Sequence, residues 1–253
     1  MVRWLLIVLF SVIATTFVHA QLLESDTSKW YFRGEGGLNW SGGNVERLLV
    51  RADMQAKHVD TTWGFVTYHN YMYGNLGKLT TENDYLSRNF LYLFPKRRLY
   101  PYMMVWIERN YRRRIDFRYQ VGPGITGVLL RKPKVLQKLS ATATYEATDF
   151  APNVILSDGT LATAPINVWR LTARAYGKLT PFDAPLHIGY EFWFQQSLQQ
   201  SQNYRYYVEG LAEYRWAKHL AFKSQISLSH EQLTLRSFKK TDWYWTLGFS
   251  YTY

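Results

Sequence analysis

Histidine and serine side chains are the first candidates for chemistry, because a Ser–His pair can act as nucleophile and general base. His230 lies close in the chain to Ser227 and Ser229, and His69 is a second candidate base. On an extended strand, side chains an odd number of residues apart point to opposite faces, which separates His230 from both serines. The sequence therefore favours a protein that is not an enzyme, and a lipid hydrolase remains the third functional hypothesis.

Metal and cofactor chemistry also lacks a pattern. The chain has no cysteine, and His58, His69, His187, His219 and His230 are scattered without the spacing of metal ligands. No glycine-rich, phosphate-binding loop opens a helix. We therefore predict no metal site and no cofactor.

Two runs of basic residues could bind phosphate through several hydrogen bonds at once. They comprise Arg112, Arg113, Arg114, Lys239 and Lys240. Each run lies in a predicted turn, where the phosphate groups of lipid headgroups, including those of lipopolysaccharide, could reach it. Solvated turns are the equally simple alternative.

The elements that would position these residues are strands, because apolar and polar residues alternate along the chain. About twelve segments of roughly ten to fourteen residues show the pattern, which is the length that crosses a bilayer at a tilt. Either face of the segment 85–94 could be the apolar one. The segments cover residues 30–40, 47–57, 63–74, 85–94, 99–110, 115–128, 136–148, 167–179, 185–196, 204–216, 220–232 and 241–253.

The polar face of these strands carries charges of both signs. If the apolar face meets lipid, these charges point into the lumen of a barrel, where they must compensate one another. They either fill the interior or line a narrow polar channel. The lumen candidates are Arg33, Glu35, Arg47, Arg51, Asp53, Arg118, Arg170, Arg174, Glu191, Arg205, Glu209, Glu213 and Lys223.

The connections alternate in length, as they do in outer-membrane barrels. Short turns lie at 58–60, 95–98, 131–134, 180–183 and 217–219. Longer connections lie at 75–83, 149–166, 197–203 and 233–240. With both termini in the periplasm, the longer connections face outward, and the segment 149–166 could cover the mouth or contact a partner.

The first twenty residues have the features of a secretory signal peptide. Arg3 precedes an apolar run, and Val18-His19-Ala20 resembles a cleavage site, so we expect cleavage between Ala20 and Gln21. Residues 21–29 would then form a periplasmic segment and residues 30–253 the barrel. The formal net charge of +11 suggests an acidic partner, and export argues against nucleic acid.

The last strand is aromatic along one face and runs to the end of the sequence. Its alternation resembles the C-terminal assembly signal of outer-membrane barrels, in which the barrel-assembly machinery would read Gly248, Phe249, Tyr251 and Tyr253. A sheet with a face in lipid must also close on itself, so we expect this strand to pair with the first. A water-soluble barrel of the lipocalin kind is the alternative, with its apolar face inward.

The opening hairpin, GGLNWSGGNVERLLVRADMQAK, resembles a bacterial domain-of-unknown-function family whose members are often labelled salt-induced outer-membrane proteins. YHNYMYGN at 68–75 and DFRYQVGPGITGVLL at 116–130 are similar to further strands of that family. The resemblance covers roughly residues 30–253. It implies an outer-membrane barrel and no established biochemical activity.

The predicted fold is all-β, a single up-and-down antiparallel transmembrane β-barrel of about twelve strands. The first functional hypothesis is a structural barrel or narrow polar channel in a bacterial outer membrane. The second is an accessory subunit that contacts another envelope protein.

Overall fold

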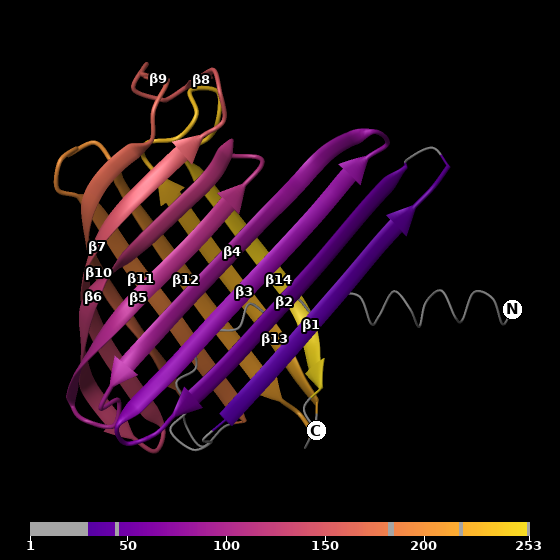
Figure 1. The fold of residues 1–253 in the computed structure, drawn as a ribbon. Helices are drawn as coiled ribbons and strands as arrows, with labels where there is room; N and C mark the ends of the chain where they lie inside the picture. The colour runs from indigo at the N-terminus through magenta and orange to yellow at the C-terminus, as the bar shows by residue number, and fades with distance from the viewer. Residues whose placement is uncertain (1–29, 44–45, 182–184, 218–219, 252–253) are drawn as a thin grey trace, which may run out of the picture.

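The structure, a computed structural model, describes residues 30–43, 46–181, 185–217 and 220–251, and these residues are almost entirely β-strand (Figure 1). Among them, no helix is long and apolar enough to span a membrane. The strands are β1 (Trp30–Ser41), β2 (Arg47–Val59), β3 (Trp63–Leu76), β4 (Leu79–Leu93), β5 (Leu99–Asn110), β6 (Ile115–Lys132), β7 (Val135–Phe150), β8 (Val154–Ile155), β9 (Leu161–Ala162), β10 (Ile166–Leu179), β11 (Leu186–Ser197), β12 (Tyr204–Arg215), β13 (Leu220–Glu231) and β14 (Thr241–Tyr251).

The twelve long strands form a single antiparallel sheet in which each strand pairs with its neighbours in the chain. Figure 1 shows this sheet curving around a central space, with β1 to β5 in front of the later strands. The short hairpin of β8 and β9 lies outside the sheet order, between β7 and β10, and projects from one end (Figure 1). The predicted up-and-down barrel of about twelve strands is therefore confirmed.

The seam between the first and last strands differs from the prediction. Among the described residues, the hydrogen-bonded order begins at β1 and ends at β14, with no pairing between them. β1 contains Gly34, Gly36 and Gly37, and a glycine-rich strand has few side chains to specify a register. Tyr253, which was expected to seal the barrel, lies outside the described residues.

The connection between β3 and β4 is much shorter than the predicted loop at 75–83. β3 continues to Leu76 and β4 begins at Leu79, so only two residues separate the strands. Gly77 has a φ of 58°, a conformation that glycine adopts without steric penalty. The tight turn extends both strands.

Burial alternates along the strands and identifies the inner face. In β7, Glu146 is 1% exposed although its neighbours in sequence are more open, and Leu139 on the other face is 46% exposed. The inner face is therefore polar and the outer face apolar, the reverse of a water-soluble protein. The lipocalin alternative is wrong for this reason.

Burial also shows which face of β4 points inward, a question that the sequence did not answer. Phe90 and Tyr92 are buried, whereas Leu91 and Leu93 are both 46% exposed. The even-numbered residues of β4 therefore face inward. Inward side chains from distant strands meet across the interior, as the rings of Trp106 on β5 and Trp193 on β11 show at 6.2 Å.

Candidate functional site: the charged interior

A network of ion pairs crosses the interior near the end that carries the β8–β9 hairpin. Arg118 on β6 donates from Nη2 to Oε1 of Glu231 on β13, at 2.7 Å. These strands are far apart in the sheet order, so the bond runs across the barrel rather than along its wall. Arg205 on β12 lies 3.6 Å from the same carboxylate.

Glu146 on β7 forms the second centre of this network. It accepts hydrogen bonds from Nε and Nη2 of Arg170 on β10, at 2.9 and 3.0 Å, and also pairs with Arg205. Arg170 donates further to the backbone and side-chain oxygens of Asn203, at 3.0 and 2.6 Å. Two carboxylates and three guanidinium groups thus share one buried cluster.

Because its side chains are almost completely buried, this cluster is stable only while its charges are paired. The side chains of Arg170 and Glu146 are each 2% exposed, and those of Arg118 and Glu231 are 4% and 6% exposed. A charge removed from water is tolerated only when partners and hydrogen bonds compensate it. We therefore regard the cluster as a core of polar side chains that fills this part of the barrel.

The basic run at 112–114 does not behave as a single surface patch. Arg113 turns inward and pairs with Glu231 and, at 2.8 Å, with Asp242, so protein carboxylates already engage its guanidinium group. The buried carboxylate of Glu231 and the partly exposed carboxylate of Asp242 attract it. Arg112 pairs with Glu82, and this hydrogen bond raises the pKa of the Arg112 guanidinium. Arg114 is exposed.

The connection between β7 and β10 packs onto the connection between β13 and β14. Leu156 and Leu235 form an isolated antiparallel bridge, and the Ser157 amide donates to the Thr234 carbonyl at 2.8 Å. Both leucines belong to an apolar cluster with Ile115 at the start of β6. The two connections therefore form one folded unit at this end. Lys239 in the second connection is exposed and Lys240 partly exposed.

The opposite half of the interior is filled by aromatic rings. Tyr92, Tyr100 and Tyr102 pack at centroid distances of 5.6 to 5.8 Å, and each is at most 6% exposed. Next to them, Arg174 donates from Nε to Glu191 at 2.9 Å and lies 4.0 Å from the Tyr176 ring centroid. Sequence reasoning missed the tyrosines, although Tyr100 and Tyr102 share one strand face.

The other lumen candidates are placed at different depths. Arg51 pairs with Asp53 at 2.7 Å, whereas the side chain of Arg47 is 45% exposed near the end of β2. Glu209 and Lys223 are 5% and 7% exposed.

The pair of Glu213 with Arg215, at 3.0 Å, is more open, with side-chain exposures of 21% and 48%. The backbones of Arg33 and Glu35 belong to β1, but their side chains are not described.

The predicted assembly and cleavage signals are described only in part. Gly248 lies in β14, whereas the side chains of Phe249 and Tyr251 are outside the description. Ala20 and Gln21 also lie outside the described residues.

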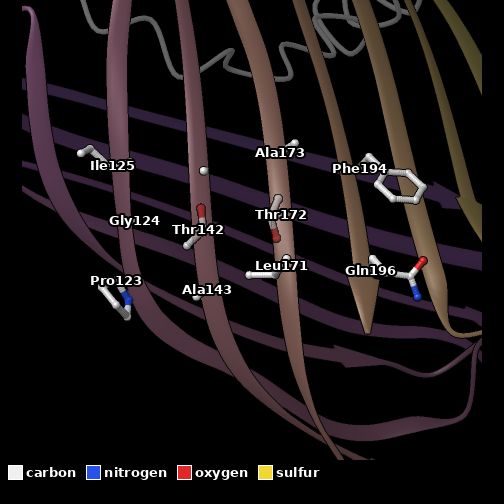
Figure 2. Close-up of a pocket in the computed structure, with 11 residues that line it drawn as sticks. Pro123, Gly124, Ile125, Thr142, Ala143, Leu171, Thr172, Ala173, Phe194 and Gln196 are labelled. Atoms are coloured by element: carbon white, nitrogen blue, oxygen red, sulfur yellow. The ribbon is translucent and has the colours of Figure 1, made fainter. Parts of the chain in front are cut away.

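The outer wall carries a shallow apolar groove of about 580 Å³. Figure 2 shows it crossing β6, β7, β10 and β11, between side chains such as Ile125, Leu171 and Phe194. Its floor is formed by small residues that include Gly124 and Ala173. This lining is typical of a surface in contact with hydrocarbon.

The candidate Ser–His pairs considered from the sequence are not hydrogen-bonded around His230 in this structure. The ring nitrogens of His230 face Thr241 at 2.8 Å and Gln232 at 3.3 Å, rather than Ser227 or Ser229. Within the described ranges, no three His, Asp or Glu side chains are grouped so that they could hold a metal ion.

An all-β barrel with a charged interior and an apolar exterior is the class that this fold defines. Residues 34–253 match the model of a family described as "Protein of unknown function, DUF481", and the chain belongs to this family. No curated protein matches the sequence significantly. A solved structure described as the NanC porin in a rhombohedral crystal form is similar, with a TM-score of 0.49 and 7% identity. The match covers 88% of this chain and 99% of that chain.

Proposed function

We propose that this chain is an outer-membrane β-barrel of a diderm bacterium with a closed interior, a structural barrel without catalytic activity. The support is the inversion of burial, with leucines outside and paired charges inside, because hydrocarbon can solvate only the apolar face. Both termini would lie in the periplasm, which leaves the β8–β9 hairpin outside the cell.

One observation carries the closed state: the ion pairs of Arg118 with Glu231 and of Arg205 with Glu146 join strands that are not neighbours in the sheet, cross the interior and are almost fully buried. A water-filled channel would leave such side chains hydrated. The aromatic layer of Tyr92 and Tyr100 occupies the other half.

Conductance in planar bilayers tests this proposal. The wild-type barrel should give no stable stepwise current. A variant that removes side chains from both the ion-pair cluster and the aromatic layer, R118A/E231A/Y92A/Y100A, should conduct. The matched control E213A/R215A/Y214A/Y244A removes the same residue types from more exposed positions and should stay silent.

Stable currents from the wild-type protein would instead support the narrow polar channel. A conducting control would show that the buried layers do not hold the barrel closed. In each case, slower migration of the protein after boiling verifies that a folded barrel was inserted.

Contacts with lipid and protein form the second part of the proposal. Exposed Arg114 and Lys239, together with Lys240, would bind phosphate groups of outer-leaflet lipid such as lipopolysaccharide. The barrel-assembly machinery would read Gly248 and the residues after it during insertion. An accessory role beside another envelope protein is the second candidate function, supported by polar side chains on the outer face of β3 and β4.

A further inference from the structure

Five polar side chains form a hydrogen-bonded chain on the outer face of β3 and β4. They occupy alternate positions near the middle of each strand, on the face that is largely apolar elsewhere, as the groove in Figure 2 illustrates. Thr67 and Ser87 are covered by their neighbours, with exposures of 7% and 2%. Hydrocarbon offers such groups no hydrogen-bond partner. The chain consists of Tyr85, His69, Thr67, Asn89 and Ser87.

The direction of these hydrogen bonds follows from the amide of Asn89. Its Nδ2 donates to Ser87 Oγ at 2.8 Å and to the Val105 carbonyl at 3.4 Å, so its Oδ1 faces Thr67. Thr67 donates to this oxygen at 2.6 Å and must accept from Nε2 of His69, at 2.8 Å. Nδ1 of His69 shares a second hydrogen bond with Tyr85 Oη, at 2.9 Å.

Nε2 of His69 therefore carries a hydrogen in this arrangement. It donates to Thr67 and cannot remove a proton from that hydroxyl, so the arrangement is not that of an activated nucleophile. Ser87, opposite His69 in the register, receives its hydrogen bond from Asn89 instead. The cluster is thus better suited to contact than to catalysis.

The cluster retains unused hydrogen-bonding capacity of both kinds. Tyr71 is 41% exposed, and the described residues offer its hydroxyl no partner. The oxygen of Tyr85 can accept a hydrogen bond besides the one that it shares with His69. Tyr71 and Tyr85 lie opposite each other in the register, so a two-fold axis between them would pair the Tyr71 donor of one copy with the Tyr85 acceptor of the other.

The surroundings of the cluster also suit a second copy. Ala52, Met54 and Leu91 form an exposed apolar border. The five cluster residues carry no formal charge, in a chain with a net charge of +11. Two copies can meet here without close contact between like charges, and Arg109 lies only at the edge, opposite Tyr85.

We propose that this outward face of β3 and β4 is the surface through which two copies of the chain pack against each other within the membrane. The inference rests on the proposed membrane location. Contact between the faces would give the Tyr71 hydroxyl a hydrogen-bond partner that lipid lacks, while the border buries apolar surface.

Thiol cross-linking tests the dimer cleanly, because the natural chain has no cysteine. Met54 is 53% exposed and lies opposite His69 in the register, so M54C should form a product of twice the mass in proteoliposomes. The matched control is A173C, on the opposite apolar wall shown in Figure 2, and it should give severalfold less product. Adding Y71F to M54C removes the Tyr71 hydrogen bond from both copies and should weaken association about eightfold.

Three outcomes would overturn the dimer. M54C could remain a monomer, both cysteine variants could cross-link equally through random collisions, or M54C could cross-link only to a protein of different mass. Loss of the mobility difference between boiled and unboiled samples would refute the membrane barrel itself. A monomer that keeps this difference refutes only the dimer.

Discussion

At the scale of residues, the interior depends on charges that no solvent compensates. Glu146 is the clearest case, because Arg170 and Arg205 both pair with its carboxylate. A single change in such a cluster leaves buried guanidinium groups without a counter-charge. The effect of a substitution should therefore follow burial rather than the number of ion pairs.

We expect Glu146→Gln to lower the free energy of unfolding by about 3 to 5 kcal/mol, as breaking a buried pair does. Glu213→Gln removes the same charge from the more open pair with Arg215 and should cost about 0 to 1 kcal/mol. Urea unfolding of the refolded protein in lipid vesicles, followed by tryptophan fluorescence, measures both values. Equal losses would contradict the assignment of Glu146 to a buried core.

At the scale of elements, the close approach of β6 and β7 depends on one glycine. A Cβ placed on Gly122 would lie 1.9 Å from the carbonyl oxygen of Ala143 and 2.8 Å from Cα of Thr144. Both are backbone atoms and cannot move aside as a flexible side chain would. The pairing of these strands in turn positions Arg118 and Glu146 in the ion-pair cluster.

Gly122→Ala should therefore sharply reduce the folded fraction, measured as the protein that migrates differently before and after boiling. Gly127→Ala on the same strand is the matched control, since its Cβ would lie 3.7 Å from its nearest neighbour, Leu99 Cδ1. Normal folding of the Gly122 variant would mean that β6 and β7 can separate without loss of the barrel.

At the scale of the whole molecule, β1 and β14 are not paired among the described residues. Ion pairs across the interior instead link distant parts of the curved wall. Arg113 reaches Asp242 of β14 from the connection after β5, and Arg118 reaches Glu231 of β13. A barrel filled in this way should resist detergent as a compact particle.

We therefore expect the unboiled protein to migrate faster in detergent gels than the boiled protein. The physical reason is that the folded barrel binds less detergent and is more compact than the unfolded chain. Identical mobility of the two samples would count against the fold as a whole.

Much of the fold could be predicted from the sequence, because the two-residue period of a strand is a local property. Alternation along residues 136–148 predicts the strand and both of its faces, and the buried Glu146 and exposed Leu139 agree with it. The turn at Gly77 was missed because the polar residues at 80–84 resemble a loop, although they continue β4.

The sequence by itself thus determined the strands, their order and the inward face of strands such as β7. Only the tertiary structure decided which charges meet, since Arg118 and Glu231 are 113 residues apart and approach through the curvature of the sheet. In the tertiary structure, Arg113 also points into the mouth of the barrel, and Phe90 lies inside it. Among the described residues, β1 and β14 are not paired. These outcomes depend on distances across the barrel, which no local pattern encodes.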